Sequence, residues 1–438
     1  MKRTKLSPRF WAALTIFSLI GQIAWVVENM YFNVFIYKMF HASAEAISTM
    51  VAASAVAAAL TTLLMGVLSD KLGKRKLFIC GGYILWGVSI WSFALIRTDV
   101  IGKLFPAAVS AASVGVSLVI VMDCVMTFFG STANDACFNA WVTDSTDETN
   151  RGAAEGVNAM MPLLAILAVF GGFMGFDLDQ ASAWVTIYTV IGLVVIAVGV
   201  LGLFLIREPR IDRSGNRSWL RNLVYGFRPG VMREHPALYL TLAAFAVFNI
   251  SIQIFMPYLI LYYEVSLGME DYVLIMAPAI VLAAAATFFY GRLYDRFHFR
   301  GTLLPALGML CGGYLLLYFT RSTVPVFLGS LLMMSGYLSG MAVFGAKVRD
   351  CTPVGKTGMF QGLRIVGQVL IPGVIGPWIG AWVLRNAETI VGSDGTVSFI
   401  PHAGIFLAAL IAAFFVVPAA SLVFRSERKL NEPKSNNL

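Results

Sequence analysis

A few ionisable side chains interrupt long apolar stretches of this sequence, and they are the groups that could do chemistry. Glu28, Asp135 and Arg364 each lie among mostly apolar residues. A charged side chain in hydrocarbon costs at least about 2.5–3.5 kcal/mol on insertion scales. Such groups therefore face a cavity or a partner, and they are candidates for binding or coupling.

Asp135 is a candidate ion-coupling residue. It precedes the expected end of its helix by about seven residues, roughly 10 Å of helical rise, which removes it from water. One carboxyl at that depth can carry a proton, whereas it supplies too few oxygen ligands to bind a metal cation well. Simple packing is the alternative for Asp135. Glu155, just inside the next apolar stretch, is a second coupling candidate, and Asp123 is expected to be solvated near the outer end of its helix.

Arg364 falls inside an apolar stretch near the C-terminus. A buried guanidinium without a counter-ion is very costly, so Arg364 should pair with a carboxylate or bind an anionic substrate. The possible intramembrane partners are Asp135, Glu155 and Glu28.

The first apolar stretch carries a polar face. Gln22, Trp25, Glu28 and Asn29 follow helical spacing, which predicts that they share one face of a helix. Sugars are commonly held by stacking on an aromatic ring while amides and carboxylates bind their hydroxyl groups. The face is therefore a candidate substrate site, and hydrogen bonding between helices is the alternative for Gln22 and Asn29.

Composition and length define the elements that hold these residues. Of the 438 residues, 58% are hydrophobic and 13% are charged, against about 25% charged in soluble domains. A helix needs roughly 20 apolar residues to cross a bilayer, and the sequence predicts an all-α membrane protein of twelve such helices. They are expected at 10–38, 46–69, 77–96, 117–142, 153–173, 184–206, 237–263, 271–294, 301–320, 323–349, 358–384 and 402–424.

Basic residues predict the orientation of these helices. Segments on the side of the N-terminus hold 26 of the 32 Lys and Arg residues, and such an excess is typical of cytoplasmic loops. Both termini are therefore expected in the cytoplasm of a multi-pass cell-membrane protein. The net charge of +8 then reflects topology and anionic lipid, so no nucleic-acid partner is expected.

Several functional classes lack their sequence signals. The five cysteines form no C-x-x-C pair, and no phosphate loop, nucleophile elbow or H-E-x-x-H motif is present. The sequence therefore predicts no enzyme, no cofactor and no metal site.

An internal repeat predicts two similar halves. The stretch around Asp144 matches that around Asp350 at an offset of 206 residues, and GVLSDK at Gly66 matches GRLYDR at Gly291 at an offset of 225. The difference between the two offsets predicts an insertion within 97–115, whose structure the sequence does not indicate. Two parallel six-helix bundles follow. Their expected bounds are 1–206 and 237–424, with a cytoplasmic linker at 207–236 and a cytoplasmic tail at 425–438.

The repeat also adds candidates for substrate binding. Glu155 and Asn158 align with Gln361 and Arg364, and Gln253 occupies the repeat position of Glu28. Asn249 lies one turn before Gln253, where a structural polar pair is the alternative. The substrate-binding candidates are Gln22, Trp25, Glu28, Asn29, Asn158, Asn249, Gln253, Gln361 and Arg364.

The segment from Gly66 to Leu77, GVLSDKLGKRKL, resembles the motif between helices two and three of the major facilitator superfamily. That resemblance implies the twelve-helix fold of the superfamily and a cytoplasmic charge network that gates its inward face. Asp70, Arg75 and Asp295 are the residues in this role, and ordinary anchoring by basic residues is the alternative.

A finer resemblance is to the glycoside-pentoside-hexuronide:cation symporters. It is carried by DACFNAWV from Asp135 and by the paired loops at Asp144 and Asp350. We expect these two loops to take part in gating. The segment Gly21–Trp25 is similar to the first helix of the related sucrose and proton-coupled sugar carriers. The branch places an aspartate like Asp135 in its cation site. It also carries carboxylates in helix two, where this sequence reads AVAAALTTLLMG, so a proton is favoured over sodium.

These features predict a secondary carrier with substrate held near the midplane between the halves, most simply a proton:sugar or proton:glycoside symporter working by alternating access. An exporter of drugs or metabolites and a carrier of lysolipids are the alternatives, because one fold hosts many cargoes. A membrane enzyme or receptor would need a catalytic cluster or a soluble domain, and the sequence shows neither.

Overall fold

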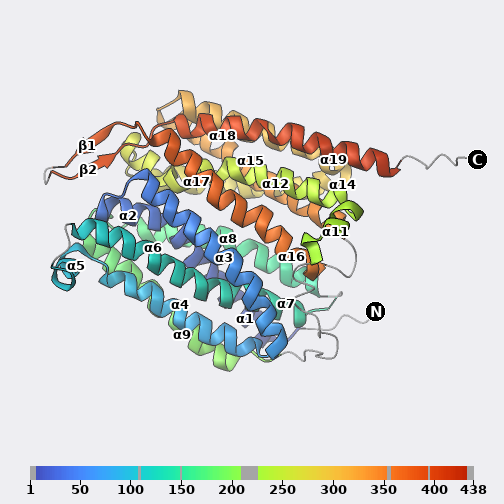
Figure 1. The fold of residues 1–438 in the computed structure, drawn as a ribbon, viewed down its shortest axis with the longest axis horizontal. Coiled ribbons are helices and arrows are strands. Elements are labelled where there is room, and N and C mark those ends of the chain that lie inside the picture. Colours follow the sequence, from blue (N-terminus) through green and yellow to red (C-terminus); the bar gives the residue numbers. More distant parts are fainter. Residues whose placement is uncertain are drawn as a thin grey trace, which may run out of the picture. The chain divides into compact units, whose positions relative to one another are not determined.

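The computed structural model describes residues 6–106, 110–147, 150–208, 225–352, 357–392 and 395–431. In these residues the regular secondary structure is helical apart from one small β-hairpin (Figure 1). Twelve helices are long and apolar enough to cross a membrane. The predicted all-α membrane fold with twelve spans is therefore confirmed.

The N-terminal half follows the expected succession of spans. The second, third, fifth and sixth spans each contain one α-helix, and the first and fourth each contain two α-helices joined by a π-helical segment. The helices are α1 (Pro8–Val26), α2 (Phe32–Phe40), α3 (Ala44–Leu72), α4 (Arg75–Ser92), α5 (Thr98–Leu104), α6 (Ala111–Gly130), α7 (Asn139–Asp144), α8 (Arg151–Phe173) and α9 (Ala181–Leu205).

The C-terminal half repeats the pattern with more irregular helices. They are α11 (Pro229–Glu234), α12 (Pro236–Phe255), α13 (Leu259–Leu261), α14 (Tyr272–Phe319), α15 (Thr323–Cys351), α16 (Thr357–Ile365), α17 (Ile371–Leu384), α18 (Gly404–Phe414) and α19 (Val416–Asn431), with strands β1 (Thr389–Val391) and β2 (Val397–Phe399). α14 holds two spans, which meet near a kink where His298 has a φ of 53°.

Four spans contain a short π-helical segment: Val27–Tyr31, Ser131–Phe138, Tyr262–Ser266 and Val366–Leu370. A π-helical turn inserts an extra residue, shifts the faces of the helix on either side of it and often marks a functional site. Two of the four hold carboxyl groups singled out above, Glu28 and Asp135.

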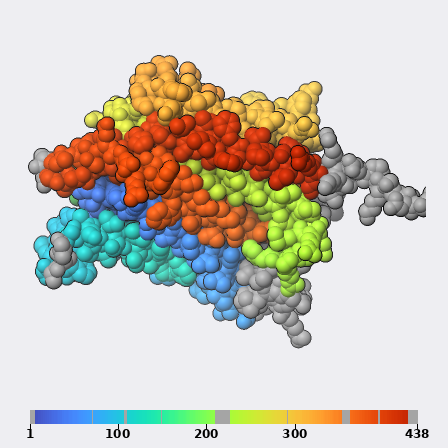
Figure 2. Space-filling model, turned by 45° about the horizontal axis from the view of Figure 1, so that its top comes forward, coloured from blue at the N-terminus to red at the C-terminus, as the bar shows by residue number. Residues whose placement is uncertain are grey.

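The chain forms two compact units, one of Met1–Trp219 with Glu388–Ile400 and one of Leu220–Ala387 with Pro401–Leu438. The β-hairpin, with Thr389 opposite Phe399, therefore packs in the first unit although its flanking helices belong to the second. Tyr37 donates a hydrogen bond to the carbonyl of Phe399 at 2.6 Å. In Figure 2 the orange-red hairpin accordingly lies against blue residues.

In the first unit, α4 and α9 pack with their backbones in close approach. A Cβ added to Gly192 would lie 2.8 Å from the carbonyl oxygen of Gly87. Glycine is needed on both helices because backbone cannot move aside as a side chain can. This contact fixes α4, whose N-terminus carries the predicted gating arginine.

The predicted insertion at 97–115 contains the short helix α5, at the same end of the first unit as the hairpin (Figure 1). Arg97 precedes α5 and donates to Asp99 in its first turn at 2.9 Å. That hydrogen bond lowers the pKa of the Asp99 carboxyl below its usual range. The pair stabilises the N-terminus of α5.

Candidate transport site

Three spans of the first unit converge on the carboxyl group of Glu28. Its Oε1 accepts hydrogen bonds from the Ser54 hydroxyl of α3 at 2.7 Å and from the Thr127 hydroxyl of α6 at 2.8 Å. The two hydroxyl oxygens are themselves 2.7 Å apart. Glu28 is 7% exposed, so this carboxyl group is enclosed by the bundle.

Asp123 joins this cluster, and the expectation that it is solvated is wrong. It is 2% exposed and close enough to interact electrostatically with Glu28 and to bond the Ser54 hydroxyl. The reason is that Asp123 lies one turn before Thr127, on the same inward face of α6. The inward position of Asp123 could have been inferred from this spacing in the sequence.

Asp135 lies in the π-helical segment of the fourth span and is half-buried. The Ser131 hydroxyl donates to its Oδ2 at 3.1 Å. The Trp25 ring is near Asp135 and packs on Trp86 with ring centroids 5.0 Å apart. The Trp25 indole N–H is buried without a hydrogen-bond partner among the described residues. An aromatic ring, its indole N–H group and a carboxyl group therefore meet in one place.

The predicted polar face of the first span is divided between two environments. Gln22 and Trp25 are half-buried and Asn29 is exposed, whereas Glu28 points into the bundle. Asn29 donates to the carbonyl of Trp25 at 2.8 Å. The π-helical segment Val27–Tyr31 accounts for the division because its extra residue changes the spacing that regular helical periodicity assumes.

The two candidates on α8 also lie in different environments. The Ser18 hydroxyl of α1 donates to Asn158 Oδ1, so Asn158 faces the first span. Glu155 is exposed, and no hydrogen bond or ion pair joins it to another residue that the structure describes.

In the second unit, Arg364 lines a cavity of about 270 Å³. Its Nε donates to Gln368 Oε1 at 3.1 Å, and the positive charge of Arg349 acts on it. No carboxylate lines the cavity in the described part of this unit. An ion pair of Arg364 with Asp135, Glu155 or Glu28 stays a prediction. The cavity is lined by Leu238, Leu242, Val348, Arg349, Thr352, Phe360 and Arg364.

The remaining candidates of the second unit lie in α12 and α16. Asn249 is 7% exposed and donates to the Phe245 carbonyl of its own helix at 2.9 Å. Gln253 is half-buried, and its Cβ would clash with a Cβ added to Gly376 of α17. The side chain of Gln361 lies outside the described residues.

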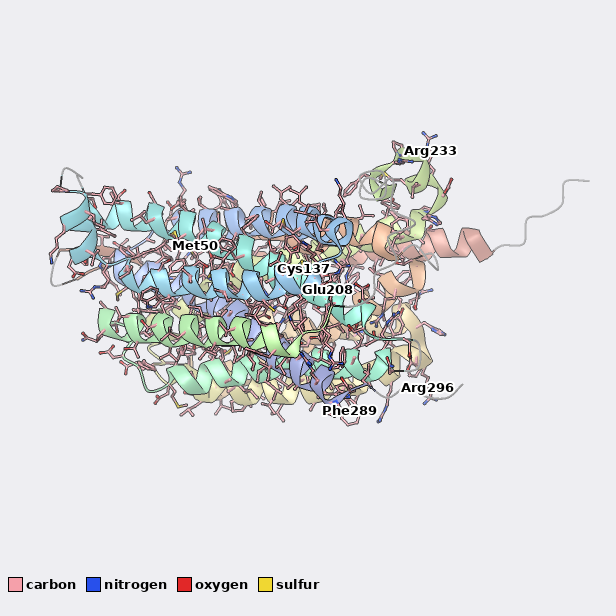
Figure 3. All side chains as sticks on the ribbon, turned by 90° about the horizontal axis from the view of Figure 1, so that it is seen from below. Met50, Cys137, Glu208, Arg233, Phe289 and Arg296 are labelled. Carbon is pink, nitrogen blue, oxygen red and sulfur yellow. The ribbon has the colours of Figure 1, made fainter. Side chains whose placement is uncertain are left out.

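The predicted gating residues of the first unit form an ion pair. Arg75 Nε lies 3.1 Å from Asp144 Oδ2. The backbone N–H groups of Arg75 and Lys76 donate to the Glu208 carboxylate at 2.5 and 3.2 Å, so Glu208 caps α4. In Figure 3, Glu208 lies to the right of Met50, farther along the length of the helices of this unit. The side chain of Asp70 lies outside the described residues.

Sequence reasoning missed Glu208, although an acidic residue directly after a span was the signal. In the second unit the repeat-related Asp350 is exposed and accepts a hydrogen bond from the Tyr294 hydroxyl at 2.6 Å. Asp295 is also exposed. The two repeats therefore use the same aspartate position differently.

Comparison with solved structures shows a common fold. A bacterial homologue of the human lysosomal transporter Spinster, in its inward-facing occupied form, aligns with a TM-score of 0.69 at 15% identity over 97% of this chain and 98% of its own. A mutant form of the nucleoside transporter NupG aligns with a TM-score of 0.69 at 12% identity over 94% and 98%. The xylose transporter XylE from E. coli aligns with a TM-score of 0.66 at 12% identity over 98% and 100%.

None of the curated proteins matches this sequence. The family model of the Major Facilitator Superfamily matches residues 10–346, which is most of the chain. Together with the twelve spans, this match identifies the chain as a member of the major facilitator superfamily of membrane transporters.

Proposed function

We propose that this transporter carries a sugar or glycoside by symport with protons. It would act in the cell membrane with both termini in the cytoplasm, as a relative of the glycoside-pentoside-hexuronide:cation symporters. The observation that carries the proposal is the meeting of Asp135, its hydroxyl donor Ser131 and the Trp25 ring in the first unit.

The substrate contacts follow from the chemistry of Trp25 and its neighbours. An aromatic ring can stack on the apolar face of a sugar, and the indole N–H of Trp25 can donate to a hydroxyl group. Gln22 and Asn29 lie within about one turn of Trp25 and are not fully buried. Their amide groups can both donate and accept hydrogen bonds. Asn158, Asn249, Gln253, Gln361 and Arg364 are the further proposed contacts.

Asp135 is the proposed coupling group. A half-buried carboxyl beside a binding surface has different charge, and different hydrogen-bonding capacity, with and without its proton. Substrate binding and protonation then change each other's free energy, which is the requirement for coupling. Glu155, exposed on α8, is the second proposed coupling residue.

The ion pair of Arg75 with Asp144 is the proposed gate of the first unit, together with Asp70. Its counterpart in the second unit comprises Asp295 and Asp350. The Arg75 side chain is buried, so its charge loses a partner in a poorly hydrated place when the pair opens. A conformational change that separates Arg75 from Asp144 is therefore opposed by a barrier.

The structural comparisons support a polar cargo. XylE is described as a xylose transporter, and a further structure, aligned with a TM-score of 0.63 at 13% identity, as a D-xylose-proton symporter. NupG is described as a nucleoside transporter. A nucleoside also presents sugar hydroxyl groups, so the same kind of site serves both.

Uptake into proteoliposomes tests the proposal. A panel of radiolabelled glycosides is offered under an inward proton or sodium gradient to wild type, Asp135→Asn, Arg364→Ala and the control Glu45→Gln, which changes an exposed carboxylate. We expect proton-driven accumulation in wild type and Glu45→Gln. In Asp135→Asn we expect accumulation to be lost while gradient-free exchange of substrate persists. Folded wild-type protein that accumulates no sugar under either gradient would exclude sugar symport.

A second candidate function is a carrier of anionic amphiphiles such as lysolipids, and the cavity of the second unit favours it. Arg349 and Arg364 can bind a phosphate, while Leu238, Leu242 and Phe360 can contact an alkyl chain. For this candidate, a lysolipid with a phosphate headgroup should raise the melting temperature of wild type. The shift should vanish in Arg364→Ala and Arg349→Ala, persist in the control Arg300→Ala, and be absent with an uncharged monoacylglycerol.

A further inference from the structure

We infer that Glu28 and Asp123, with the hydroxyl groups of Ser54 and Thr127, form a binding site for one exchangeable proton. The inference deepens the proposed function, on which its role in transport rests. It moves Glu28 from the substrate contacts to the coupling machinery, and it adds Asp123, for which the sequence suggested no role.

The site is assembled from three separate spans. Glu28 comes from the π-helical segment after α1, Ser54 from α3, and Asp123 with Thr127 from α6. Both hydroxyl groups donate to Glu28 Oε1, at 2.7 and 2.8 Å. Any change in the charge of Glu28 therefore acts directly on hydrogen bonds to two other helices of the first unit.

Two oxygen atoms at the site are buried and have no hydrogen-bond partner among the residues that the structure describes: Glu28 Oε2 and Asp123 Oδ1. Their side chains belong to residues that are 7% and 2% exposed. A buried polar atom without a partner costs free energy, and a buried negative charge costs far more. One proton removes one charge and turns an acceptor into a donor, so it relieves both penalties.

The described surroundings of the two carboxyl groups supply no positive charge. The titratable groups that interact with the two carboxyls in the described part of the chain are Asp135, Cys124 and Tyr188. Asp135 acts on Glu28 from the π-helical segment after α6, Cys124 acts on both carboxyls from α6 itself, and Tyr188 acts on Asp123 from α9. None of the three carries a positive charge. The excess of acidic groups attracts a cation to this point.

The number of oxygen atoms still available at the site favours a proton over a metal cation. Within the described residues of the site, two buried oxygen atoms lack a hydrogen-bond partner, Glu28 Oε2 and Asp123 Oδ1. A metal cation needs several oxygen lone pairs directed at one point. Two carboxylates that share a site, in contrast, readily hold one proton between them.

Infrared difference spectroscopy of purified full-length protein tests the site without substrate or gradient. Spectra taken across a pH titration report the carbonyl stretch of protonated carboxylic acids. We expect wild type and the exposed control Glu45→Gln to show a band that is absent in both Glu28→Gln and Asp123→Asn. Ser54→Ala, which keeps both carboxyls, should shift the frequency of that band because it removes one hydrogen-bond donor.

Two results would overturn the assignment. One is a band that persists unchanged in Glu28→Gln and in Asp123→Asn, and the other is its loss when Na⁺ replaces choline at constant pH, which would indicate a metal-cation site. Should either carboxyl variant fail to fold, the frequency in Ser54→Ala decides, and an unshifted band counts against the site. Because no cargo is used, this outcome is independent of whether the uptake assay identifies a sugar.

Discussion

Arg75 of α4 lies 3.1 Å from Asp144 of α7, and the two side chains are 6% and 30% exposed. The repeat-related aspartate, Asp350, accepts instead from the Tyr294 hydroxyl at an exposed position. The duplicated sequence therefore pairs one aspartate with a buried arginine, whereas the other accepts a hydrogen bond from an uncharged hydroxyl group. This asymmetry has a measurable consequence for stability.

We expect Asp144→Asn to destabilise the protein by about 1–3 kcal/mol, because it removes a charged partner of the buried Arg75 guanidinium, a cost reduced by the partial exposure of Asp144. Asp350→Asn should cost less than about 1 kcal/mol, as the exposed hydrogen bond can be replaced by water. Chemical denaturation in detergent measures both. Equal losses in the two variants would contradict the asymmetry.

The backbone contact of α4 with α9 predicts a second difference. A Cβ at Gly192 would lie 2.8 Å from the Gly87 carbonyl oxygen, whereas a Cβ at Gly81, on the same α4, would meet nothing within 4 Å. We expect Gly192→Ala to lower stability by about 1–3 kcal/mol through overpacking. Gly81→Ala, the matched control, should be neutral or slightly stabilising because alanine favours helix. Thermal unfolding distinguishes them, and a neutral Gly192→Ala would refute the contact.

The hairpin provides a third prediction. Tyr37→Phe keeps the ring that packs edge-on against Phe399 at 5.2 Å but removes the hydrogen bond to its carbonyl. Loss of one such bond costs about 0.5–1.5 kcal/mol. We expect amide hydrogen exchange in 389–399 to become roughly 2- to 12-fold faster, while exchange in α9 is unchanged. No acceleration would show that the hairpin is held by other contacts.

The sequence predicted the parts of the fold that depend on length and hydropathy. Each span is an apolar stretch long enough to cross a bilayer, so its existence could be predicted, and the repeat located Asp144 and Asp350. The pairing of Arg75 with Asp144 lies in the region that the family motif indicated.

The features that were missed depend on contacts between distant segments. Nothing local to 389–399 indicates that it packs against Tyr37. Asp123 was misjudged because its distance from the helix end predicted solvent, whereas Ser54 of another helix covers it. The division of Gln22, Glu28 and Asn29 could not be predicted because a π-helical segment interrupts the helical period.

The most direct test of proton coupling is the movement of protons with the cargo when no gradient is imposed. Proteoliposomes that contain a pH-sensitive dye receive a glycoside found in the uptake panel, and internal pH and radiolabel are followed together. Symport predicts that the interior of wild-type vesicles acidifies as sugar enters, and that Asp135→Asn vesicles show no acidification. Sugar entry into wild-type vesicles at constant internal pH would contradict proton coupling.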